Sequence, residues 1–161
     1  AKGINNAAIP MGAVAVKREI HDAVVQSAAA GAIELMHGYT YSAHPVAAAA
    51  AIAAIDLYQS EGLFERARGL SPLFEKAAHG VAGAPHVKDI RNLGLVAGIE
   101  LEPRPQAPGA RAYEVFRKCY EKGVMVRYTG DILAFSPPLI VQPEEIERMF
   151  STVREALNET R

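Results

Sequence analysis

Three separate stretches of the sequence carry side chains that can do chemistry, and the first lies at its beginning. Lys2 precedes Gly3 and a turn of small residues, where a ligand can come close to the backbone. The amine of a lysine in such a place can attack a carbonyl carbon when its surroundings favour the neutral form. The alternative is a charged side chain near a chain end, and residue type alone leaves both interpretations open.

The second stretch, HGYTYSAHP at residues 37–45, places hydroxyl and imidazole groups directly before an alanine-rich segment. A helix N-terminus attracts anions through its free N–H groups and its dipole. Tyr39, Thr40, Ser42 and His44 are therefore candidates to hold a phosphate group, whereas the alternative is that Ser42 or His44 only caps the helix. Alanine favours a helix but buries little surface, which suits a place where another backbone comes close.

The third stretch is the apolar segment VMVRY, in which Arg127 precedes the turn Thr129-Gly130-Asp131. An arginine at the end of a strand can offer its planar guanidinium to a substrate carboxylate. The alternative is an outward-facing arginine that pairs with Asp131 or with solvent. The residue chemistry alone does not decide between them.

The composition narrows the classes of partner. The 161 residues carry a formal net charge of -1 without a basic cluster, which argues against nucleic acid. No apolar run approaches the roughly 20 residues of a membrane helix. Cys119 is the only cysteine, so we expect no disulfide framework and a cytoplasmic location. His37, His44 and Cys119 match no ordinary zinc spacing, so no metal site is expected.

The segments that must carry these residues change character near Gly62. Before it, we expect a strand over Met11–Lys17, a helix over Arg18–Ser27 and an alanine helix from about Pro45 to Ser60. Met11–Lys17 is apolar on both faces, as a central strand would be. Because the chain also begins directly on such elements, without Met, we expect it to be a fragment of a longer protein.

After Gly62, the patterns predict an α/β unit in which helices cover an antiparallel sheet. We expect helices over Leu63–Arg68 and Leu70–Val81, split or kinked by Pro72, and then strands over Val87–Ile90 and Leu95–Leu101 around a turn at Asn92 and Gly94. A helix over Ala110–Lys122, ended by Gly123, and strands over Val124–Tyr128 and Ile132–Phe135 follow. The last helix opens at Gln142 and should bury Ile146, Met149, Phe150, Val153 and Leu157.

The order of these motifs resembles a known family. AKGINNAAIPMGAV, HGYTYSAHPVAAAAA, RNLGLVAGIEL and GVMVRYTGDILAFSPPL together resemble the C-terminal half of class III (fold type I) pyridoxal-phosphate aminotransferases. The run YTYSAHPVA is most similar to the ω-amino acid:pyruvate, or β-alanine:pyruvate, group. The resemblance implies an α/β fold, with residues 1–62 as the remainder of the large cofactor-binding domain and residues 63–161 as the C-terminal small domain with an antiparallel sheet and helices.

The resemblance also implies roles at matching positions. Lys2 would be the catalytic lysine that forms a Schiff base with pyridoxal 5'-phosphate. Thr40, with Tyr39 beside it, would bind the cofactor phosphate of a neighbouring subunit, and Arg127 would bind the carboxylate of the amino donor or pyruvate. The family's phosphate loop, the aromatic residue that stacks on the ring and the aspartate at the pyridine nitrogen lie upstream of the lysine. Because these groups are missing, we expect this chain to be inactive alone. The resemblance separately implies that the parent protein is a homodimer or a dimer of dimers.

Two other interpretations stay open at this point. The chain could be a non-catalytic α/β module that dimerises through the alanine helix, or the parent could be an aminomutase or decarboxylase-like relative with the same fold.

Overall fold

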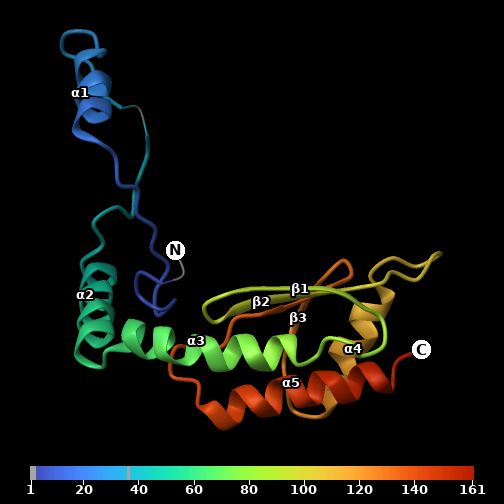
Figure 1. The fold of residues 1–161 in the computed structure, drawn as a ribbon. Helices are drawn as coiled ribbons and strands as arrows, with labels where there is room; N and C mark the ends of the chain where they lie inside the picture. The colour runs from blue at the N-terminus through green and yellow to red at the C-terminus, as the bar shows by residue number, and fades with distance from the viewer. Residues whose placement is uncertain (1–2, 36) are drawn as a thin grey trace. The chain divides into compact units, whose positions relative to one another are not determined.

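The computed structural model describes residues 3–35 and 37–161, and it divides into two units, Ala1–Glu61 and Gly62–Arg161 (Figure 1). Each unit is described by itself. The described residues of the first unit form two helices, α1 (Arg18–Gln26) and α2 (Pro45–Ser60), whereas the second unit contains three helices and a four-stranded sheet. Within the described residues, no helix is long and apolar enough to cross a membrane.

The expected strand over Met11–Lys17 is wrong, because this segment is irregular. Val14 is 87% exposed and Val16 is 56% exposed. A strand needs a neighbour whose N–H and C=O groups complete its ladder, and the described part of Ala1–Glu61 contains no strand that could pair with it. The helix expected next is present as α1, but none of its residues is buried.

Helix α2 has the expected bounds, since its sequence contains both the start signal and a strong helix former. Pro45 occupies the first turn, where its missing N–H leaves nothing unpaired, and the His44 imidazole accepts the Ala47 N–H at 3.4 Å. Ala47, Ala51 and Ala54 form its buried stripe. Other side chains of α2 are exposed, among them Val46, Ile52, Ile55 and Leu57.

In Gly62–Arg161, four strands form an antiparallel sheet in the order β1-β2-β4-β3. They are β1 (Val87–Leu93), β2 (Val96–Leu101), β3 (Arg127–Thr129) and β4 (Ile132–Phe135). The hairpin β1–β2 is longer than expected: Leu93 pairs with Val96, so Gly94 and Leu95 form the turn. Gly94 has φ +57°, a conformation that glycine adopts without strain.

The strand expected over Val124–Tyr128 starts later, at Arg127, because its neighbour β4 is short. The ladder between them begins with Arg127 opposite Ala134. After Phe135 the chain continues as Ser136-Pro137-Pro138, and prolines have no N–H with which to extend a ladder. Residues 124–126 therefore have no strand beside them, although Val126 is buried in the core.

Three helices cover one face of the sheet: α3 (Leu63–His79), α4 (Ala110–Glu121) and α5 (Pro143–Asn158). Figure 1 shows α3 and α5 side by side beneath the strands. Between the layers lies a continuous core in which the largest fully buried side chains are Phe74, Ile99, Leu101, Leu133, Ile146 and Leu157. The predicted fold class, α/β with an antiparallel sheet and helices, is confirmed.

The expected split of the helix after Gly62 is wrong, because α3 continues through Pro72. A proline inside a helix removes one hydrogen bond, here to the Arg68 carbonyl, and tends to bend the helix. Phe74 and Ala78, which follow it, are fully buried, and the Phe74 ring meets the Phe150 ring edge-on at 5.2 Å. This packing stabilises the second half of α3, so that the helix continues beyond the proline.

The ends of α4 and α5 follow their sequence signals. Gln142 and Glu145 form a capping box at the start of α5, with Gln142 N–H donating to the Glu145 carboxylate at 2.8 Å. Gly123 after α4 has φ +80° and ends that helix as expected. Four members of the stripe expected on α5 are fully or nearly fully buried, and Met149 is partly buried.

Candidate substrate-binding site

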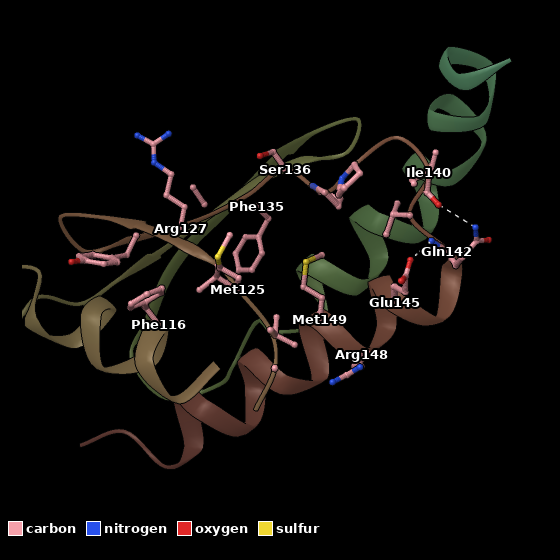
Figure 2. A pocket seen from close by; sticks show the side chains of 18 residues that line it. Phe116, Met125, Arg127, Phe135, Ser136, Ile140, Gln142, Glu145, Arg148 and Met149 are labelled. Atoms are coloured by element: carbon pink, nitrogen blue, oxygen red, sulfur yellow. Dashed lines mark hydrogen bonds between the residues drawn. The ribbon is translucent and has the colours of Figure 1, made fainter. Parts of the chain in front are cut away.

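Arg127 lies on the face of the sheet opposite to the helices. Its neighbours in sequence, Val126 and Tyr128, point the other way: Val126 is buried, and the Tyr128 ring contacts Phe116 of α4 at 5.2 Å. Because successive side chains of a strand alternate between the two faces, Arg127 must project outward. Figure 2 shows its side chain extending away from Met125 and Phe135.

The surface next to Arg127 is made of small residues. Arg127 stands opposite Ala134, Ala134 opposite Gly98, and Gly98 opposite Arg91. One row across the outer face therefore has an arginine at each end and the two small residues between them. A Cβ atom built on Gly98 would meet Ile132 Cγ2 at 3.6 Å and Arg91 Cγ at 3.9 Å, so the Arg91 side chain lies over this glycine.

The two arginines of this row differ in their partners. The Arg91 guanidinium donates to Asp89 at 2.6 Å and to Glu100 at 3.2 Å, and Glu100 also accepts from Lys88 at 2.6 Å. These hydrogen bonds, that of Lys88 first, lower the pKa of Glu100 below its ordinary value. Arg91 is thus neutralised by two carboxylates.

Arg127, in contrast, forms no hydrogen bond or ion pair with any described residue. The interpretation in which it pairs with Asp131 is wrong. One oxygen of the Asp131 carboxylate accepts the Gly109 N–H at 2.9 Å, and the other is buried. The exposed Arg127 guanidinium is therefore available to an anionic ligand on this face.

A groove of about 990 Å³ runs along the other side of β3, between β4, α4 and the start of α5. Figure 2 shows apolar side chains gathered in it, including Phe116, Met125, Phe135 and Met149. Arg127 borders this groove, but its guanidinium extends away from these side chains. Arg127 and Ala134 both line the groove, so the groove reaches around the edge strand β3 to the outer face of the sheet, where the Arg127 guanidinium lies.

In the first unit, the loop before α2 is folded tightly around Tyr39 and Thr40. The Ser42 N–H donates to the Tyr39 carbonyl at 2.9 Å, and the rings of His37 and Tyr39 stack with centroids 3.5 Å apart. Tyr39 and Ala43 have positive φ, of +35° and +58°. Of the two residues considered as caps of α2, Ser42 and His44, it is His44 that caps the helix by accepting the Ala47 N–H.

The loop presents donors that fit a phosphate group. Thr40 is exposed, and neither its hydroxyl nor its N–H has a hydrogen-bond partner among the described residues. It stands five residues before the start of α2, together with the exposed hydroxyls of Tyr41 and Ser42. Hydroxyl and backbone N–H donors near a helix N-terminus are the groups that phosphate oxygens prefer.

The predicted site residues are not assembled by the described structure. Lys2 lies outside the described residues. Tyr39 and Thr40 share one loop of the first unit, whereas Arg127 belongs to the second. Residues 3–35 and 37–161 contain no cluster of three or more His, Cys, Asp or Glu that could hold a metal ion.

Sequence reasoning did not identify the partners that fix the strand of Arg127. Tyr128 packs against Tyr113 and Phe116 of α4, and Asp131 bonds to the start of the same helix. The helical spacing of Tyr113 and Phe116 was a signal for an aromatic face. Which strand that face would meet depends on tertiary packing, which a local pattern does not encode.

Comparison with known proteins gives these features a context. The model of the family described as aminotransferase class-III matches residues 1–157. The chain belongs to the class-III aminotransferases. Among curated relatives, an omega-aminotransferase of Caulobacter vibrioides is 55% identical over 159 residues, which cover 99% of this chain and 36% of that protein. A beta-alanine--pyruvate aminotransferase of Pseudomonas aeruginosa is 46% identical, over 98% of this chain and 36% of its own length.

Solved structures of aminotransferases share this fold. An adenosylmethionine-8-amino-7-oxononanoate aminotransferase from Methanocaldococcus jannaschii superimposes with a TM-score of 0.89 at 30% identity, over 99% of this chain and 37% of its own. A Bacillus anthracis aminotransferase gives a TM-score of 0.84 at 33% identity, over 98% of this chain and 37% of its own. The chain thus spans little more than a third of the length of the relatives that it matches.

Proposed function

We propose that the protein containing this chain is a pyridoxal-phosphate-dependent transaminase that moves the amino group of an ω-amino acid such as β-alanine, or of an amine, to pyruvate. In this proposal, residues 1–62 belong to the large cofactor-binding domain and residues 63–161 form the C-terminal small domain. The observation that carries it is the unpaired Arg127 guanidinium beside the small residues Gly98 and Ala134. Similarity to an omega-aminotransferase and a beta-alanine--pyruvate aminotransferase supports the choice of substrates.

Pyridoxal phosphate, when bound, supplies an electron sink that stabilises the negative charge left on a carbon when its proton is removed. This chain would contribute Thr40 and Tyr39 to the binding of its phosphate. The Thr40 hydroxyl and N–H can both donate to phosphate oxygens, since neither has another partner in the described part of the chain. In the proposed assembly, this loop serves the cofactor of a neighbouring subunit.

Lys2 would hold the cofactor through its amine and, once the substrate amine takes that place, act as the general base. Its Nζ atom would take up the proton from the carbon that bears the substrate nitrogen and later release it. This role requires a neutral amine, which a site with low polarity or nearby positive charge favours.

Arg127 would select substrates that carry a carboxylate. A guanidinium forms two parallel hydrogen bonds with a carboxylate, which fixes its orientation as well as its position. Pyruvate and β-alanine both offer this group. An amine without a carboxylate cannot use the contact, and the Arg127 side chain is exposed, so a change of rotamer would leave room for it.

We also propose that the protein acts in the cytoplasm as a homodimer or a dimer of dimers. The exposed apolar residues Val46, Ile52, Ile55 and Leu57 on α2 support an interface along this helix.

The test is to express the protein from its whole gene, saturate it with pyridoxal phosphate and measure alanine formation from β-alanine and pyruvate. Activity that disappears in Lys2→Ala, together with borohydride labelling at Lys2 in the unaltered protein, is the expected result. Alanine formation that persists in Lys2→Ala, or no alanine formation in the unaltered protein, would overturn the proposal.

A further inference from the structure

The turn of the β3–β4 hairpin is bonded to the start of α4, far away in the sequence. The Asp131 carboxylate accepts the N–H of Gly109, the N-cap residue of α4, at 2.9 Å. A negative charge at this end of a helix interacts favourably with the helix dipole. The contact therefore ties the strand that carries Arg127 to an element outside the sheet.

The backbones of the turn and the helix start also touch. Gly109 has φ +81°, and a Cβ atom built on it would lie 3.4 Å from the Gly130 carbonyl oxygen. The Asp131 carbonyl accepts the Leu101 N–H at 2.8 Å, at the end of β2. Asp131 thus binds α4 through its side chain and β2 through its main chain.

This attachment bears directly on Arg127, because β3 is a three-residue edge strand. Only Arg127, Tyr128 and Thr129 pair with β4, and the hairpin closes through Thr129 and Ile132 around Gly130 and Asp131. With so short a ladder, the position of Arg127 along the sheet depends on how the turn is held.

The second carboxylate oxygen of Asp131 is buried, and no described residue gives it a hydrogen bond. The Gly109 N–H is therefore the one described group that the Asp131 side chain binds, and removal of the carboxylate should release the turn from the start of α4.

We propose that Asp131 is a positioning residue for Arg127: by fastening the hairpin turn to the start of α4, it holds the Arg127 guanidinium where a substrate carboxylate meets it. This inference rests on the substrate role proposed for Arg127.

The experiment compares Asp131→Ala, Asp131→Asn, Arg127→Ala and the double variant Arg127→Ala/Asp131→Ala in the cofactor-loaded protein from the whole gene. KM for pyruvate and kcat for a half-reaction with phenylethylamine, which has no carboxylate, are measured for each. Asp131→Ala should raise KM for pyruvate by about 10- to 100-fold, since small misplacements of a binding group have effects of this order. The phenylethylamine half-reaction should stay within about twofold.

Asp131→Asn should restore most of the affinity, because its side-chain carbonyl can accept the Gly109 N–H. In the Arg127→Ala background, removal of Asp131 should change KM for pyruvate by less than about twofold, because the group that it positions is gone. The control is Asp89→Asn, which removes an exposed partner of Arg91 on the same sheet and should leave both measurements unchanged.

Equal losses with pyruvate and phenylethylamine, or additive losses in the double variant, would overturn the inference by making Asp131 purely structural. If Arg127→Ala raises KM for pyruvate and Asp131→Ala does not, the inference alone fails. If Arg127→Ala itself leaves KM unchanged, the substrate role of Arg127 fails as well. Should Asp131→Ala not fold, Asp131→Glu, which moves the carboxylate by one methylene, must give the same split between substrates at a smaller size, and an equal loss for both would overturn the inference.

Discussion

The two units of the chain differ most in how far they bury their own apolar residues. In Gly62–Arg161, a sheet and three helices enclose one core in which Ile99 and other large side chains are fully buried. In the described part of Ala1–Glu61, the buried residues are Asn5 and three alanines of α2, while Ile52 of the same helix is 61% exposed. The residues of Gly62–Arg161 thus form a core of large apolar side chains, although Leu93 and Met125 of this unit are exposed. In the described part of Ala1–Glu61, no large apolar side chain is buried.

The largest expected difference between the units concerns thiol reactivity. Burial raises the pKa of the Cys119 thiol to about 11, against which the charge of Lys122 has a smaller, opposite effect. At pH 8, the fraction of Cys119 present as the reactive thiolate should be about 100-fold lower than that of an ordinary exposed cysteine. In an Ile52→Cys variant of the chain, iodoacetamide should label position 52 at least about 100 times faster than Cys119, as followed by peptide mass spectrometry. Equal labelling rates in native conditions would show that the core of Gly62–Arg161 is open.

A matched pair of substitutions sharpens the comparison at the level of stability. Ile99→Ala removes a fully buried side chain from β2 and should lower the free energy of unfolding by about 2–5 kcal/mol. Ile52→Ala removes an exposed one from α2 and should change it by about 0.5 kcal/mol or less. Urea unfolding followed by far-UV circular dichroism measures both. A large loss from Ile52→Ala in the isolated chain would mean that Ala1–Glu61 has a core of its own.

A smaller effect is expected from the ionic contacts on the surface of the second unit. Hydrogen bonds from Lys118 and then Arg104 lower the pKa of Glu114 below its ordinary value of 4.5. A lowered pKa in the folded state means that the contribution of Glu114 to stability is complete above about pH 4.5 and is lost as the pH falls through the folded-state pKa.

Glu114→Gln should therefore destabilise the chain by about 0.5–1 kcal/mol at pH 7 and by progressively less below pH 4.5, in thermal unfolding scans. Glu147→Gln is the control, since Glu147 is exposed and forms no ion pair among the described residues. A difference between the two variants that is independent of pH would mean that the Glu114 contacts contribute through packing and not through charge.

The features that depend on local signals could be predicted from the sequence, whereas those that depend on contacts between distant residues could not. Helix α2 has its expected bounds because Pro45, His44 and the alanine run are local signals, and the buried stripe of α5 follows from its period. The failures are those that depend on a distant partner. Met11–Lys17 has the composition of a strand, but no strand among residues 3–35 and 37–161 pairs with it, and α3 passes through Pro72 because Phe74 is packed in the core.

The same distinction between local signals and distant contacts applies to the candidate site. Residue chemistry singled out Arg127 and the hydroxyls around Thr40, but it could not decide whether Arg127 pairs with Asp131. That question depends on the register of β3 against β4 and on the place of Gly109, 22 residues from Asp131. Tertiary contacts of this kind have no signature in a local pattern.

The most direct test of the proposed function is the effect of Arg127→Ala on two substrates of the protein expressed from its whole gene. Loss of a desolvated contact between a guanidinium and a carboxylate typically costs about 2–5 kcal/mol, which corresponds to about 30- to 5,000-fold in kcat/KM. We expect a loss of this size for pyruvate and for β-alanine, a partial recovery in Arg127→Lys, and a half-reaction with phenylethylamine near its original rate. Equal losses for substrates with and without a carboxylate would contradict the account, because Arg127 would then serve the structure and not the substrate.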